Sequence, residues 1–126
     1  MPRHSHAAPG AAAVGPYSHA IESDPFVFLS GQTPLDPATG QLADGPVDAQ
    51  VRQCFANLGA VLSAAGLDFE DVVKVNVFLV DMGDFAAMNA VYAEQFAEPF
   101  PARTTIGVAS LPFGARVEIE LVARTR

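Results

Sequence analysis

The segment "FPARTTIGVASLP", residues 100–112, holds a single cation, Arg103, within a run of small and apolar residues. Proline and glycine flank the run, and Thr, Ile and Val fill it, which predicts a strand. An unpaired guanidinium would be costly in a buried strand, so we expect Arg103 to have a carboxylate partner. That partner is either the protein's own, at Glu118 or Glu120, or a carboxylate of a ligand, which a guanidinium binds through two parallel hydrogen bonds.

Other residue types that often carry chemistry give weaker signals. Cys54 lies on the apolar stripe of a predicted helix, so we assign it to the core. His4 and His6 form "HSH" near the N-terminus, and their spacing gives little support for a metal site. His19 follows a tyrosine and can line a cleft, but nothing in the sequence assigns it a catalytic role.

Length and charge limit the possible functions. The chain has 126 residues, enough for one domain with its own core. Its net charge is −7, and it has no cluster of Lys or Arg, which disfavours nucleic acid as the main partner. No apolar run is long enough for a membrane span, and one cysteine fits a reducing compartment, so we expect a cytoplasmic protein. Residues 1–14 lack the core of a signal peptide and are predicted to be a flexible N-terminal arm, with a single domain over 15–126.

The remaining elements follow from hydrophobic periodicity. Residues 48–65 have apolar side chains at helical spacing, with Asp48 as a candidate cap and Gly66 as a candidate end. A second helix is predicted from about Asp84, ending before Pro99. Strands are predicted over residues 26–34, 71–80, 100–112 and 115–123. The sequence therefore predicts an α+β domain in which two α-helices cover one face of a β-sheet.

The alternation along these strands predicts what the second face of the sheet carries. If the helices cover Val73, Val75, Val77 and Leu79, the other face holds a polar set and two aromatic residues. A polar face can simply be solvated. However, large aromatic residues are usually covered, which favours packing against another subunit, with polar groups collected between chains. By parity this face would carry Lys74, Asn76, Arg103, Thr105, Glu118 and Glu120, with Phe28 and Phe78.

Six segments resemble the Rid family, the reactive intermediate deaminases of the RidA (YjgF) type. They occur in family order and cover nearly the whole chain after residue 14: "GPYSHAI" (15–21), "FLSGQTPLDPATG" (28–40), "AAGLDFEDVVKVNVFLVDM" (64–82), "FAAMNAVYAEQF" (85–96), "FPAR" (100–103) and "VEIELVA" (117–123). The resemblance implies a chorismate-mutase-like fold with a mixed β-sheet and a homotrimer built around a central barrel. It also implies sites at the subunit interfaces and hydrolysis of enamino or imino acids, such as 2-aminoacrylate, to 2-keto acids and ammonia. It implies no cofactor and no metal.

The resemblance also assigns roles to individual positions. Arg103 matches the arginine that clamps the substrate carboxylate, and Glu118 matches the glutamate that orients the attacking water. The remaining matches are substrate-binding: Tyr17, Ser30, Gly31, Asn89 and Thr105. Many members have cysteine where this chain has Thr105, and the loop before "FPAR" looks shorter than in some relatives. Both differences bear on pocket size and substrate preference.

Elementary chemistry agrees with these roles but leaves alternatives open. Hydrolysis of an imine needs a positioned carboxylate and one group that accepts and then returns a proton, which a partly desolvated glutamate can provide. Glu118 can instead be a solvated strand residue, and Ser30 can serve its Ser-Gly bend. Tyr17 and Asn89 can be ordinary surface or packing groups. At the level of function, a non-catalytic trimer that binds small carboxylates is the main alternative, and an RNA-directed activity is disfavoured by the acidic charge.

Overall fold

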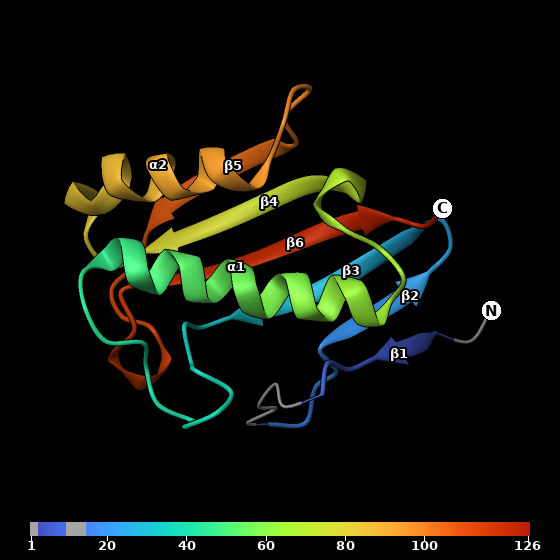
Figure 1. Ribbon diagram of the computed structural model, residues 1–126, viewed down its shortest axis with the longest axis horizontal. Coiled ribbons are helices and arrows are strands. Elements are labelled where there is room, and N and C mark those ends of the chain that lie inside the picture. The colour runs from blue at the N-terminus through green and yellow to red at the C-terminus, as the bar shows by residue number, and fades with distance from the viewer. Residues whose placement is uncertain (1–2, 10–14) are drawn as a thin grey trace.

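The computed structural model describes residues 3–9 and 15–126, which form one six-stranded sheet with both long helices on the same face (Figure 1). The strand order is β1-β2-β3-β6-β4-β5. β4 and β5 are parallel and the other neighbours are antiparallel, so the predicted mixed sheet and α+β class are confirmed. The strands are β1 (His4–His6), β2 (Ala20–Ser23), β3 (Phe26–Gln32), β4 (Val72–Leu79), β5 (Ala102–Gly107) and β6 (Val117–Arg124), and the helices are α1 (Val47–Ala64) and α2 (Phe85–Gln95).

Helix α1 begins and ends within one residue of its predicted bounds. Its apolar stripe is fully buried against the sheet and includes Cys54, as expected. The predicted cap is wrong: Pro46 occupies the N-cap without a side-chain hydrogen bond, and Asp48 lies in the first turn. Gly66 follows the helix at φ +76°, a left-handed conformation that glycine adopts without strain, so its predicted role at the helix end is confirmed.

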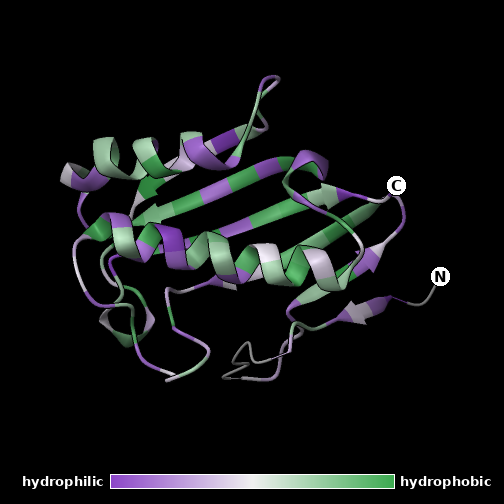
Figure 2. Cartoon of the chain, in the orientation of Figure 1, coloured by the Kyte–Doolittle hydropathy of each residue, from purple (hydrophilic) through white to green (hydrophobic). Residues whose placement is uncertain are grey.

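The central strands alternate between a buried and a half-exposed face, and hydrophobic and hydrophilic residues alternate along them in Figure 2. Val117, Ile119 and Leu121 of β6 are buried under the helices, whereas Glu118 and Glu120 are only half-buried. One prediction fails in β4, because the register shifts between Val72 and Lys74. That irregularity places Val72 in the core, and Val73, which was expected there, is 37% exposed.

The N-terminal segment differs from the prediction. His4–His6, assigned to a flexible arm, form the edge strand β1, which pairs with β2, and His6 Nε2 lies 2.9 Å from a carboxylate oxygen of Glu22. Both strands are too short to show a clear period in the sequence, so neither was predicted. Residues 1–2 and 10–14 of the predicted arm lie outside the described residues.

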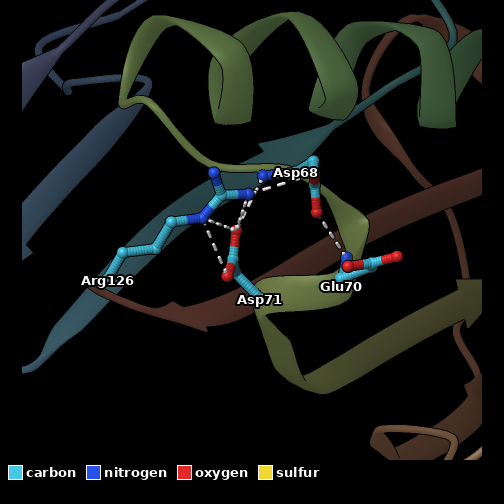
Figure 3. A network of polar contacts seen from close by, with 4 residues as sticks. All are labelled: Asp68, Glu70, Asp71 and Arg126. Atoms are coloured by element: carbon cyan, nitrogen blue, oxygen red, sulfur yellow. Dashed lines mark hydrogen bonds and ion pairs between the residues drawn. The ribbon is translucent and has the colours of Figure 1, made fainter.

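The end of β6 is held beside the short helix that leads into β4 (Figure 3). Asp68 and Asp71 form a capping box at this helix (Phe69–Asp71), and the Arg126 guanidinium donates hydrogen bonds to both carboxylates. The hydrogen bond from Arg126 lowers the pKa of the Asp71 carboxyl. Arg126 and Asp68 are largely exposed and Asp71 is half-buried, so this contact fixes the chain end but adds only modestly to stability. No helix of the described residues is long and apolar enough to cross a membrane.

Candidate functional site

Arg103 lies on the helix-covered face of the sheet, not on the face where parity placed it. In the parallel pairing of β4 and β5, Arg103 stands opposite Val75 and Thr105 opposite Val77, and both valines are fully buried under the helices. The assignment of Arg103 and Thr105 to the open face is therefore wrong. The alternation within β5 divides its side chains into two sets on opposite faces. Only the pairing of β5 with β4 decides which of the two sets faces α2.

The Arg103 guanidinium is held by three side chains of α2. Its Nη1 donates a hydrogen bond to Asn89 Oδ1 at 2.8 Å. Its Cζ lies 4.6 Å from the ring centroid of Tyr92 and 5.6 Å from that of Phe85, which places the cation over both aromatic rings. These three residues follow helical spacing, and that spacing was the signal by which Tyr92 and Phe85 could have been found.

Arg103 forms no ion pair with any residue that the structure describes. The alternative of an internal salt bridge to Glu118 or Glu120 is therefore not realised within this chain. The guanidinium instead borders a cavity of about 320 Å³. We call this the arginine cavity; its lining is mainly apolar and consists of Asn89, Tyr92, Ala93, Phe100, Pro101 and Arg103.

Glu118 lies on the opposite, open face of the sheet, beside Phe78 of β4. Burial raises the pKa of the Glu118 carboxyl, and the negative charge of Glu120 raises it further. Glu120 itself accepts a hydrogen bond from the Asn76 amide at 2.9 Å. A half-buried carboxyl with a raised pKa is suited to exchanging a proton near neutral pH.

Gly31 gives the Glu118 side chain its place. A Cβ atom at position 31 would lie 2.3 Å from Glu118 Oε2 and 3.0 Å from its Cδ, so the carboxyl group occupies the space that any other residue's side chain would fill. Gly31 lies where the register of β3 shifts against β6, between Leu29 and Gln32. The bulge and the missing side chain together let the carboxyl lie against the backbone of β3.

Ser30 connects this bulge to the segment that carries Tyr17. Its hydroxyl donates a 2.6 Å hydrogen bond to the carbonyl of Ser18, and its N–H donates to the carbonyl of His19. The Ser30 hydroxyl thus serves the backbone, which was the alternative left open by the sequence. Tyr17, the neighbour of Ser18 in the chain, is 42% exposed and borders the same cavity as Glu118.

These residues border a second cavity, of about 410 Å³, which we call the glutamate cavity. It contains two residues of a loop that the sequence did not single out, Pro112 and Phe113. The only hint was a Pro-Phe-Gly turn just before β6. Its lining consists of Tyr17, Ser30, Gly31, Thr33, Pro112, Phe113, Glu118 and Glu120.

The predicted site residues are thus divided between two cavities that share no lining residue. Arg103 and Asn89 border the arginine cavity, and Glu118, Gly31, Ser30 and Tyr17 border the glutamate cavity, on the other face of the sheet. Thr105 lines neither; its hydroxyl is buried and has no hydrogen-bond partner among the described residues. The described residues contain no group of three His, Cys, Asp or Glu side chains that could hold a metal ion. Burial raises the pKa of the Cys54 thiol, which keeps it protonated and unreactive in the core.

Comparison with known proteins identifies the family of the chain. The family model described as Endoribonuclease L-PSP matches residues 6–125. A goat (Capra hircus) protein named 2-iminobutanoate/2-iminopropanoate deaminase is 50% identical over 112 residues, which are 89% of this chain and 82% of that protein. The crystal structure of the yjgF gene product from E. coli has a TM-score of 0.90 and 41% identity, and covers 98% of this chain and 99% of that one. The structure of E. coli TdcF with bound serine has a TM-score of 0.84 and 38% identity, and covers 90% of this chain and 91% of that one. Because the family model spans nearly all of the sequence and both sequence and fold match its members, the chain belongs to the YjgF/RidA family.

Proposed function

We propose that this protein hydrolyses small 2-imino and 2-enamino acids to 2-keto acids and ammonia. The observation that carries the proposal is Arg103, a guanidinium fixed by Asn89 and Tyr92 that borders a cavity and has no carboxylate partner in the described chain. Such a group is ready to bind the carboxylate of a ligand. The goat relative's name assigns that protein the same reaction, and TdcF holds serine, a small amino acid with one carboxylate.

Glu118 supplies the acid–base chemistry of the proposed reaction. Water adds to the carbon of the protonated C=N bond while Glu118 accepts a proton from it, which gives a neutral tetrahedral intermediate. The same carboxyl then protonates the nitrogen of that intermediate, the C–N bond breaks and ammonia leaves, and the Glu118 carboxylate takes the hydroxyl proton as the C=O bond of the keto acid forms. An enamino acid enters this sequence after its β-carbon is protonated and it becomes the imine. A carboxyl group whose pKa is raised by burial can act in both directions near neutral pH.

The two cavities give the proposal a quaternary requirement. Arg103 and Glu118 lie on opposite faces of one chain, so a ligand of a few carbon atoms cannot reach both. We infer that Arg103 of one subunit and Glu118 of a neighbouring subunit meet in a homotrimer. The open face of the sheet supports this inference, because it exposes large apolar side chains that a neighbour would cover: Phe26, Phe28 and Ile106.

Within that composite site, the remaining residues have secondary roles. Tyr17, Ser30 and Gly31 would shape the side of the site that holds the water, and Asn89 would orient the clamp. Thr105 would contribute through its backbone. We propose that the reaction uses no cofactor or metal and takes place in the cytoplasm, which fits a chain with one buried, reduced cysteine.

The test couples an amino-acid oxidase to semicarbazide trapping of the imino acid that the oxidase releases. The wild type should suppress semicarbazone formation, and Arg103→Ala should abolish that suppression. Arg52→Ala is the matched control, because Arg52 is an exposed arginine whose ion pairs with Asp48 and Glu94 lie on the surface. A folded wild type that suppresses nothing, yet binds small carboxylates through Arg103, would establish the non-catalytic alternative.

Mixing two inactive variants tests the composite site. Arg103→Ala and Glu118→Ala subunits are mixed in equal amounts, unfolded together and refolded as random trimers. A site is complete when a Glu118→Ala subunit supplies its arginine and a neighbouring Arg103→Ala subunit supplies its glutamate. About a quarter of the wild-type activity should then return. No recovery, with mixed trimers demonstrated by mass spectrometry, would place both groups in a site within one chain.

A further inference from the structure

Phe113, at the edge of the glutamate cavity, has a backbone conformation that its residue type disfavours. Its φ is +63° and its ψ is 12°, in the left-handed region, where a Cβ atom crowds the neighbouring carbonyl. Among the described residues it is the only one besides glycine with positive φ. A strained conformation persists only where the surroundings enforce it, and such residues concentrate at functional sites.

The loop around Phe113 is anchored on both sides of the strained residue. Ahead of it, Pro112 begins a short helical turn, and the Pro112 carbonyl accepts a hydrogen bond from Ala115 N–H at 3.1 Å. Behind it, the Arg116 guanidinium donates two hydrogen bonds to the Asp84 carboxylate, at 3.0 and 3.1 Å. The backbone is thus fixed while the Phe113 side chain remains 53% exposed at the cavity.

The chemistry proposed for Glu118 places the substrate's side chain in this cavity. The imine carbon must lie within reach of the water that Glu118 holds, so the side chain attached to that region of the substrate starts a few ångströms from Glu118. Apolar surface there comes from Phe113, Pro112 and the ring of Tyr17. Beyond Glu118 the cavity also contains the Glu120 carboxylate, which would repel a second negative charge on the substrate.

We propose that Phe113 is a specificity-determining residue: its ring forms the wall against which the substrate's side chain packs. The protein should therefore prefer 2-imino acids with bulky apolar or aromatic side chains over small ones, and should discriminate against those with a second carboxylate. This inference rests on the proposed deaminase function, and it assigns that function a substrate class.

The experiment compares kcat/KM for the imino acids derived from phenylalanine, leucine, alanine and glutamate. Phe113→Gly removes the ring and the strain, and Phe113→Asn places a polar residue that tolerates the same backbone conformation. In both variants the ratio of phenylalanine-derived to alanine-derived activity should fall about tenfold, with the alanine-derived activity changed less than about threefold. Phe113→Gly should also melt at a higher temperature than the wild type. Leu111→Ala is the matched control, because Leu111 is a large apolar residue of the same loop that does not line the cavity.

Two outcomes overturn the proposal, and they are distinguishable. In the first outcome, the wild type is active but both Phe113 variants keep its ratio of kcat/KM for phenylalanine-derived over alanine-derived imino acid. Phe113 then does not contact the substrate, and the specificity role is wrong. If the folded wild type acts on none of the four imino acids, the deaminase function itself fails and this inference fails with it.

Discussion

Replacing Gly31 with alanine is the sharpest test of how the glutamate cavity works, because the atoms nearest to the added methyl group all belong to the Glu118 side chain. The new Cβ would lie 2.3 Å from Glu118 Oε2, whereas ordinary van der Waals contact begins near 3.4 Å. The carboxyl must therefore retreat by about 1 Å, a displacement that can reduce catalysis about 100-fold. That loss in kcat/KM corresponds to about 2.7 kcal/mol of transition-state stabilisation.

The fold should tolerate the same change. The atom that Cβ meets belongs to the end of a flexible side chain, and the φ of Gly31 lies outside the left-handed region. Alanine also loses less conformational entropy on folding than glycine. We therefore expect the melting temperature of Gly31→Ala to stay the same or rise. Gly107→Ala is the matched control, since its Cβ would crowd the flexible side chain of Met82 at 3.2 Å, outside the glutamate cavity.

Two results would refute the reasoning. Gly31→Ala with full activity and an unchanged melting temperature would mean that the carboxyl position is not important. A double variant with Glu118→Gln gives the second test: because both changes act on one carboxyl group, the pair should be no less active than Glu118→Gln alone. Simple multiplication of the two losses would show that Gly31 acts through something other than Glu118.

Three further substitutions separate catalysis, orientation and stability. Because burial and Glu120 raise the pKa of Glu118, the stability contributed by its proton is full below the ordinary glutamate pKa and is lost as pH rises through the raised value. Glu118→Gln should thus lower activity strongly, to a residual level that can still be measured, yet melt higher than the wild type at about pH 8, and this advantage should vanish near pH 4 in calorimetry. Asn89→Ala removes the hydrogen bond that orients Arg103, so KM should rise about tenfold while kcat changes less; an unchanged KM would contradict that role. Thr105→Val removes a buried hydroxyl without a described partner and should stabilise the fold by about 1 kcal/mol in denaturant unfolding with activity retained; destabilisation would mean that the hydroxyl is bonded.

The sequence determined the main elements of the fold and the identity of the chemical groups. The long amphipathic helix, predicted over residues 48–65 and found over 47–64, and the alternation of β6 could be predicted because their periods extend over many residues. Arg103 and Glu118 were identified from their types and from the family segments around them. The short strands β1 and β2 were missed because three or four residues carry too little periodic signal.

Only the tertiary structure decided on which side of the sheet each group lies. Alternation within β5 separates Arg103 and Thr105 from their neighbours, but the pairing of β5 with β4 turns that set toward α2, and no local pattern encodes this register. Likewise, the strained Phe113 and the closeness of Gly31 to Glu118 depend on loop and strand positions far apart in the chain. The sequence by itself thus named an arginine clamp and a glutamate, whereas the three-dimensional arrangement placed them in separate cavities, because long-range pairing sets which side chains share a surface.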